Sequence, residues 1–196
     1  MKVIRKIRKY RKKIAKFDPQ NRNIMNRKSQ GTVPAGSGNA IKPRKILFVC
    51  LGNICRSPAA EEVMRTLVRE SGEEADYVLD SAGTYGGHAG QLSDSRMCAH
   101  ARRRGYQLTH RSRPVRSSDF DDFDLIVAMD DSNYDRLRSL APTLEARDKV
   151  VRMMDYARLH PYYDSVPDPY YEGAEGFELV LDLLEDACAG LLDRCR

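Results

Sequence analysis

The sequence predicts a single α/β domain, built on a central parallel sheet of about four strands with helices on both faces. After residue 44, short apolar runs alternate with longer stretches whose apolar residues recur at steps of three and four. A chain of 196 residues with 41% hydrophobic residues can form one substantial core. No internal repeat is visible, and no apolar run approaches the roughly 20 residues of a membrane-spanning helix. These observations exclude repeat arrays and membrane bundles.

The first half of the predicted domain contains two strands and two helices. Ile46–Val49 is an apolar run typical of a buried strand. A helix is expected from Pro58, with Ser57 as its N-cap, because proline suits the first helical turn. Tyr77–Asp80 is the second strand candidate. Ser93–Arg104 has a helical pattern and is followed by a glycine, a common residue at helix ends.

The second half repeats this alternation. Leu125–Met129 is strongly apolar and predicts a strand. A short helix around Ser132–Ser139 and a strand around Val150–Met153 follow. A last helix carries one apolar face, which consists of Phe177, Val180, Leu181, Leu184, Cys188 and Leu191.

The first 43 residues differ from the rest in composition. Residues 1–44 hold 14 Lys and Arg against Asp18 alone, so the remaining residues carry −8 although the whole chain has a net charge of +5. Residues 2–17 have a basic amphipathic helix pattern, and residues 29–43 are rich in Gly, Ser and Pro. We therefore expect a basic, flexible tail and linker over 1–43 and the folded domain over 44–196. The tail is a candidate for contact with an anionic membrane surface or a partner, whereas nucleic acid is not expected to bind.

The cysteines indicate a reducing environment and no structural metal. Their number is odd, their spacing is irregular, and no cysteine pair or histidine has the spacing of a zinc site. The N-terminus lacks the apolar stretch of a secretory signal. We predict a cytoplasmic protein that needs neither metal nor cofactor. The five cysteines are Cys50, Cys55, Cys98, Cys188 and Cys195.

A cysteine followed six residues later by an arginine occurs three times, but only once in a suitable context. Two of the pairs fall inside predicted helices, where residues six apart point to different sides. The remaining pair lies between a buried strand and a helix, where free backbone N–H groups can surround an anion. The pairs are Cys50 with Arg56, Cys98 with Arg104, and Cys188 with Arg194.

The segment from Cys50 to Ser57, CLGNICRS, therefore predicts a phosphate-binding loop. Gly52 and Asn53 suit the left-handed backbone conformation that such a loop needs. A free thiol has a pKa of about 8.5, and a helix N-terminus with a nearby guanidinium favours the thiolate, so Cys50 is a candidate nucleophile. Arg56 offers a planar fork of donors for two phosphoryl oxygens, and Ser57 can donate a hydrogen bond to the thiolate.

Asp168 is the candidate for the acid that protonates a leaving oxygen. It lies in the run Val166-Pro-Asp-Pro-Tyr-Tyr171, where two prolines stiffen a loop. Tyr170 and Tyr171 can form the wall of a slot for an aromatic ring. Without the loop at Cys50, this run would predict only a turn.

Together, the motif from Cys50 to Pro58 and the downstream Asp168-Pro-Tyr-Tyr171 resemble a low-molecular-weight protein tyrosine phosphatase, over roughly residues 44–194. The resemblance implies hydrolysis of phosphotyrosine, in proteins or as small aryl phosphates, through a phosphocysteine on Cys50. Arg56 would clamp the phosphate, and Asp168 would act as acid and then as base. The remaining loop residues implied to bind phosphate are Leu51, Gly52, Asn53, Ile54, Cys55 and Ser57.

The resemblance also implies supporting residues that the patterns alone do not single out. Asn53 would hold the strained loop through Ser81 and His110, and Asp130 would support the same network. Alone, His110 resembles an ordinary loop histidine and Asp130 a helix cap. Cys55 matches a second cysteine that can trap an oxidised nucleophile as a disulfide, which implies redox control.

The cleft departs from the family at one position. Tyr170 and Tyr171 match tyrosines that line the family's cleft and are phosphorylated in some members. Gly87, in contrast, stands where animal members carry an aromatic residue on the loop after the second strand. Tyr85 and His88 are the candidates to replace this wall; otherwise the cleft is open to bulkier substrates.

Three other functions remain as alternatives. Thiol-dependent arsenate reduction uses a similar loop but needs further cysteines on a mid-chain segment, and residues 129–138 contain none. Phosphoarginine hydrolysis is associated with Thr at the position that Ile54 holds, so Ile54 favours an aromatic ester. A phosphate-binding module without catalysis is disfavoured because Cys50, Arg56 and Asp168 are all present.

Overall fold

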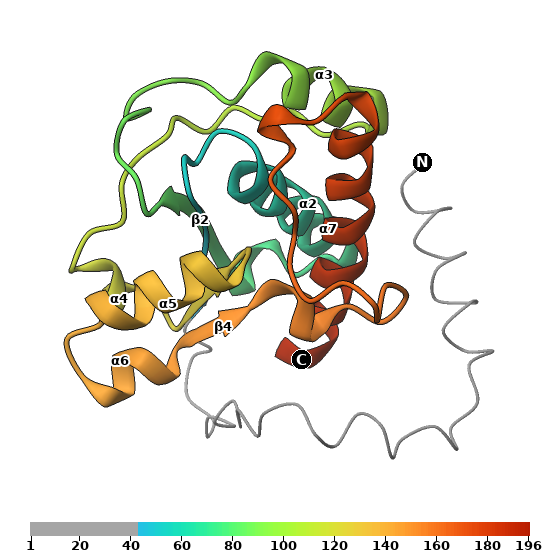
Figure 1. Cartoon of the computed structure of the whole chain (residues 1–196). Helices are drawn as coiled ribbons and strands as arrows, with labels where there is room; N and C mark the ends of the chain where they lie inside the picture. The colour runs from blue at the N-terminus through green and yellow to red at the C-terminus, as the bar shows by residue number, and fades with distance from the viewer. Residues whose placement is uncertain (1–42) are drawn as a thin grey trace. The chain divides into compact units, whose positions relative to one another are not determined.

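The computed structural model describes residues 43–196, and the expected basic helix and linker lie outside this part of the chain (Figure 1). Four strands form its sheet: β1 (Arg44–Cys50), β2 (Tyr77–Gly83), β3 (Leu125–Ala128) and β4 (Val150–Arg152). The α-helices are α2 (Arg56–Ser71), α3 (Ser95–Arg104), α4 (Asp119–Asp122), α5 (Asp131–Leu140), α6 (Leu144–Asp148) and α7 (Ala174–Cys195). Three short 3-10 turns complete the fold: η3 (Glu74–Asp76), η4 (Met153–Tyr156) and η5 (Pro169–Tyr171).

The sheet is parallel throughout, in the order β2-β1-β3-β4. β1 is central, and its last residue, Cys50, pairs with Gly83 at the end of β2. The next strand in the sequence, β2, lies on one side of β1, and β3 lies on the other side. The carboxyl end of β1 is therefore at the point where the strand order reverses direction. Open α/β sheets bind their ligands in the crevice at such a point. The predicted fold class and strand number are confirmed.

Helices cover both faces of the sheet. Alternate strand residues point to opposite faces, so Leu47 and Val49 share one of them. There they join a buried cluster with Ala82, Ile126, Ala128 and Val150 from the sheet and Phe120, Phe123, Leu137, Ala141 and Ala146 from the segments around α4, α5 and α6. On the other face α2 packs against β1, β2 and α7, as Figure 1 shows.

Several boundaries differ from the sequence expectations. α2 begins at Arg56, not Pro58, and Cys55 occupies the N-cap position without a side-chain bond. Pro58 is tolerated because the N–H groups of the first turn have no partner within the helix. α3 begins at Ser95 because Asp94 caps it, its carboxylate accepting from Arg96 N–H. The short helices α4 and α6 were not predicted.

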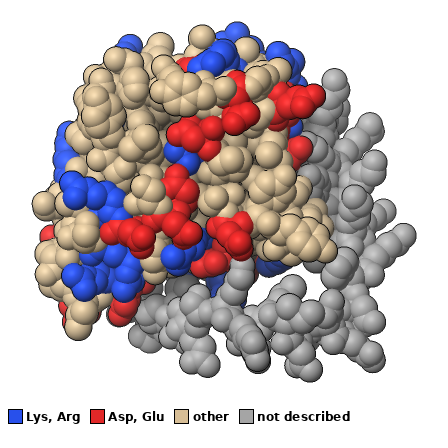
Figure 2. All heavy atoms as spheres, in the orientation of Figure 1, with Lys and Arg blue, Asp and Glu red and all other residues tan. Residues whose placement is uncertain are grey.

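The apolar face predicted for the last helix is confirmed: the six residues expected on it are all buried. Within residues 43–196, no helix combines the length and apolar character needed to cross a membrane. Figure 2 shows acidic side chains in a band across one face, with Lys and Arg beside them. Because residues 45–196 carry −8, a phosphate must be attracted by local groups rather than by the net charge of the domain.

Candidate active site

Cys50 ends β1, and its thiol lies beneath the loop that leads into α2. Its side chain is almost fully buried. The sulfur lies 3.1 Å from Ser57 Oγ and accepts a hydrogen bond from Asn53 N–H, with 3.3 Å between nitrogen and sulfur. The Asn53 N–H is thus aimed at the sulfur, whereas in the Ser57 contact either the thiol or the hydroxyl can be the donor.

Asn53 holds the loop in a conformation that side chains rarely adopt. Its φ is +54°, and no other non-glycine residue in the described part of the chain has a positive φ. Its amide nitrogen donates to Ser57 Oγ at 2.9 Å and to Ser81 Oγ at 3.0 Å. Its amide oxygen lies 3.0 Å from His110 Nε2 and accepts from Arg113 N–H at 2.9 Å. These bonds offset the cost of the left-handed backbone.

A charged cluster supports these partners, and its two carboxylates were not expected from the sequence. Glu61 accepts a hydrogen bond from Ser81 Oγ at 2.8 Å and lies 3.3 Å from His110 Nδ1. Asp80 lies 3.5 Å from the same ring nitrogen. Possible metal-ligand atoms of these three ionisable residues fall within 4.8 Å of one another. The two carboxylates also bind Arg65 and Arg113, so the cluster forms an ion-pair network.

Arg56 is buried at the start of α2 and has carboxylates on both sides. Nη1 donates to Asp130 at 2.6 Å and to the Val166 carbonyl at 3.2 Å, and Nη2 donates to Asp168 at 2.6 Å. Burial opposes its charge, but Cys50, Asp168 and Asp130 outweigh that effect and raise the pKa of the guanidinium. Asp130 also caps α5 through Asn133 N–H, so it combines both roles considered from the sequence.

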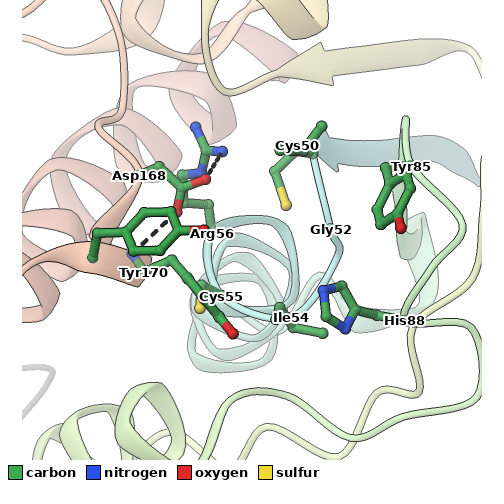
Figure 3. Close-up of a pocket in the computed structure, with 11 residues that line it drawn as sticks. Cys50, Gly52, Ile54, Cys55, Arg56, Tyr85, His88, Asp168 and Tyr170 are labelled. Carbon is green, nitrogen blue, oxygen red and sulfur yellow. Dashed lines mark hydrogen bonds and ion pairs between the residues drawn. The ribbon is translucent and has the colours of Figure 1, made fainter.

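Asp168 is the most accessible member of this group, since its side chain is 41% exposed. It precedes η5, and its second oxygen accepts from Tyr170 N–H at 3.2 Å, which fixes the carboxylate at the edge of the site. In Figure 3 it lies opposite the Cys50 sulfur, beside Arg56. This position allows proton exchange with a group bound between Asp168 and Cys50.

These residues surround a pocket of about 260 Å³. That volume is below the roughly 300–1,000 Å³ of typical ligand pockets, so the pocket suits one small group or side chain. Figure 3 shows Asp168 and Tyr170 on one side and Tyr85 and His88 on the other. Asn53, Ser57, Ser81, His110 and Asp130 lie outside its lining. The lining residues are Cys50, Leu51, Gly52, Ile54, Cys55, Arg56, Tyr85, His88, Asp168, Tyr170 and Tyr171.

Comparison with known proteins identifies the family. The model of the low molecular weight phosphotyrosine protein phosphatases matches residues 45–196. The chain belongs to this family. A protein-tyrosine-phosphatase of Streptomyces coelicolor is 44% identical over 78% of this chain and 93% of its own length, and a human relative is 34% identical over 77% and 95%. The crystal structure of a protein tyrosine phosphatase from Entamoeba histolytica has a TM-score of 0.76, 48% identity, and coverage of 78% of this chain and 96% of its own.

In this phosphatase, Gly87 leaves room for a tyrosine from another position. A Cβ atom added at Gly87 would lie 2.2 Å from Cε1 of Tyr85, so the Tyr85 ring covers the glycine backbone. The ring is 57% exposed and meets His88 edge to face, with 6.2 Å between ring centroids. Both side chains line the phosphatase pocket.

The opposite wall of the phosphatase cleft is held by an arginine that the sequence did not indicate. Arg96 lies over the Tyr170 ring, 5.2 Å from its centroid, and pairs with Asp94. Tyr170 is 38% exposed and Tyr171 is 94% exposed. Tyr170 is therefore the more buried part of this wall, whereas Tyr171 projects into solvent.

The other cysteines of the phosphatase have different environments. Burial, together with Asp94 and Cys50, raises the pKa of Cys55, which keeps this thiol protonated at neutral pH. Cys188 is fully buried in α7, where burial also raises its pKa. Arg104, which follows Cys98 at the same spacing as Arg56 follows Cys50, pairs with Glu178 and Asp182 and faces no anion loop.

Proposed function

We propose that this phosphatase hydrolyses phosphotyrosine through a phosphocysteine on Cys50. The observation that carries the proposal is the position of the Cys50 sulfur in the pocket, in contact with Ser57 Oγ and Asn53 N–H. Arg56 and Asp168 line the same pocket, so nucleophile, phosphate clamp and acid face one volume. Because no metal is needed in this scheme, activity should persist in the presence of a chelator.

The first step transfers the phosphoryl group to sulfur. The incoming phosphate dianion replaces the Asp168 carboxylate on Nη2 of Arg56, while Asp130 and the Val166 carbonyl keep Nη1 in place. The Cys50 thiolate attacks phosphorus as the bond to the phenolic oxygen breaks. Protonated Asp168 gives its proton to that oxygen, and tyrosine leaves.

The second step regenerates the thiolate. Asp168, now ionised, accepts a proton from water, and the resulting hydroxide attacks the phosphorus of phosphocysteine. The bond between sulfur and phosphorus breaks, and inorganic phosphate leaves. Ser57 Oγ, 3.1 Å from the sulfur, stabilises the departing thiolate.

The cleft supports an aromatic substrate. Tyr170 on one side and Tyr85 with His88 on the other can enclose a flat ring. We assign to Tyr85 the wall that an aromatic residue at position 87 provides in animal members. Ile54 lines the pocket as an apolar side chain, which favours an aryl ester over the guanidinium of phosphoarginine. Arsenate reduction needs a further pair of cysteines, and it is disfavoured because Cys188, which is seven residues from Cys195 on the last helix, is buried in α7.

The cellular setting of the proposal rests on composition. A nucleophilic thiol stays active only when it is reduced, and all five cysteines are free, which supports a cytoplasmic location. The basic residues of the first 43 positions support contact of the tail with an anionic membrane surface or an acidic partner. Cys55 supports reversible redox control through a disulfide with Cys50.

The test compares phosphotyrosine, phosphoserine and phosphoarginine peptides side by side, with chelator and thiol reductant, for the wild-type protein and Cys50→Ser. We expect turnover of phosphotyrosine only, and its loss in Cys50→Ser. Turnover that persists in Cys50→Ser would refute the mechanism. If no peptide is hydrolysed, arsenate is the next substrate, and failure there would indicate a binding role.

A further inference from the structure

Four carbonyl groups of the loop after β1 accept hydrogen bonds from segments outside the loop. Three of the donors are backbone N–H groups, and the fourth is a side-chain hydroxyl. The pairs are Thr84 N–H to Cys50 O (2.9 Å), Tyr85 N–H to Leu51 O (2.9 Å), Asp94 N–H to Ile54 O (2.8 Å) and Ser112 Oγ–H to Gly52 O (3.1 Å).

Fixing a carbonyl also fixes the N–H group of the same peptide unit. A trans peptide is planar, and its C=O and N–H point in opposite directions. The unit between Gly52 and Asn53 illustrates this: its oxygen accepts from Ser112, and its N–H points to the Cys50 sulfur at 3.3 Å. The Ser112 hydroxyl therefore acts on the sulfur through one rigid peptide.

This peptide needs an external constraint more than the others do. It leads into Asn53, whose positive φ is costly for a residue with a side chain. Without the bond to Gly52 O, the peptide can rotate away from the sulfur to relieve that cost. The amide contacts of Asn53 restrain its side chain but not the plane of the preceding peptide.

Ser112 is well placed to provide the constraint. It is only 3% exposed, and its backbone is bonded on both sides to the segment after β2: its N–H donates to Gln91 O at 2.8 Å and its carbonyl accepts from Gly90 N–H at 2.7 Å. The same segment supplies Asp94 N–H for the Ile54 carbonyl. The hydroxyl is thus held by a rigid part of the fold.

We propose that Ser112 is a positioning residue, whose hydroxyl aims the Gly52–Asn53 peptide N–H at Cys50 and so promotes the thiolate on which the proposed function rests. Among the four donors, Ser112 is the one whose contact a substitution can remove directly, because the other three are main-chain groups. Ser112 is not itself a lining residue of the pocket, and it reaches the site through its hydrogen bond to the carbonyl of Gly52, which is one.

The test uses the full chain with Ser112→Ala and measures the rate of Cys50 alkylation by iodoacetamide as a function of pH. Removing one hydrogen-bond donor from an oxyanion hole lowers kcat by roughly 100- to 1,000-fold. In Ser112→Ala the donor to the sulfur is loosened but not removed, so we expect a smaller effect, a decrease of about 10-fold in the thiolate population at a given pH. The pH midpoint of alkylation should rise by about one unit, which is the shift that corresponds to this factor in thiolate population. Inorganic phosphate should also inhibit the variant less strongly.

Ser93→Ala is the matched control. Ser93 is also a buried serine, but its hydroxyl has no hydrogen-bond partner among the described residues, so the control should leave the alkylation midpoint unchanged. Ser112→Thr retains the hydroxyl and should behave like the wild type. A shift in Ser112→Thr as large as in Ser112→Ala would attribute the effect to packing and overturn the proposal.

An unchanged alkylation midpoint in folded Ser112→Ala would also overturn it. That outcome is distinct from failure of the proposed function, in which the wild-type protein itself hydrolyses no phosphotyrosine. The thiol measurement does not depend on turnover, so the two results can be read separately.

Discussion

Replacing Gly87 with alanine should displace the aromatic ring that we assign to the cleft wall. The added Cβ would lie 2.2 Å from Cε1 and 2.4 Å from Oη of Tyr85, far inside the roughly 3.5–4.0 Å of a normal contact. The ring belongs to a flexible side chain that is 57% exposed, so it can move away without disturbing the core. Gly87→Ala should therefore fold normally and lose the wall.

The expected loss follows from the value of one aromatic contact. A pair of aromatic rings contributes about 0.5–1.5 kcal/mol in addition to the effect of the surface it buries. This free energy corresponds to a change of roughly 2- to 10-fold in affinity. We expect kcat/KM for a phosphotyrosine peptide to fall by about that factor in Gly87→Ala, whereas inhibition by inorganic phosphate should not change. Steady-state kinetics with both ligands measures the two effects separately.

A double-mutant cycle tests whether the effect passes through Tyr85. Tyr85→Ala should show a loss similar to that of Gly87→Ala, and the double variant should lose little more than either alone. Losses that multiply in the double variant would refute the reasoning, because Gly87→Ala would then act on the cleft without moving the ring.

Three further predictions concern the acid, the arginine and the fold. Asp168→Asn should lower kcat by roughly 100- to 10,000-fold in steady-state kinetics while phosphate inhibition persists. Asp130→Asn should weaken phosphate inhibition by about 10-fold, because a charge-assisted bond to the buried Arg56 is worth about 1.5–3 kcal/mol and is only partly lost. Burial disfavours the ionised form of Glu178, but hydrogen bonds from His100 and Arg104 outweigh this effect and lower its pKa to about 2. Ionised Glu178 should therefore stabilise the folded state fully above about pH 4.5, and this contribution should decline as the pH falls toward 2. At pH 7, Glu178→Gln should lower the free energy of unfolding in urea by about 1 kcal/mol, because the side chain is partly exposed. This difference from the wild type should be smaller at about pH 3, and a difference that does not change with pH would contradict the prediction.

The parts of the fold that the sequence predicted are those with strong periodicity. β1, β3 and α7 carry uninterrupted apolar patterns, and their positions were expected within a few residues. α4 and α6 have four and five residues, too few for a helical period to be recognised. The start of α2 was misplaced because Ser57 resembles an N-cap, whereas its hydroxyl in fact contacts the Cys50 sulfur.

The candidate site divides in the same way. The loop from Cys50 to Ser57 is contiguous, so its residue types alone indicated an anion site. Ser81, His110 and Asp130 were expected only from the family resemblance. They are distant from the loop in the sequence, and only the tertiary structure brings them close to it. Glu61 and Ser112 were missed: one is a helix residue and the other a loop serine, and only the structure brings them to Ser81 and to the Gly52 carbonyl.

The most direct test of the central claim is to trap the covalent intermediate. Asp168→Asn, mixed with p-nitrophenyl phosphate, whose leaving group needs no proton from an acid, and quenched in alkali, should accumulate a phosphoryl group that peptide mass spectrometry locates on Cys50. The same treatment of Cys50→Ser should give no labelled cysteine. A phosphoryl group on any other residue, or p-nitrophenol release with no labelled protein at any time point, would contradict a phosphocysteine mechanism.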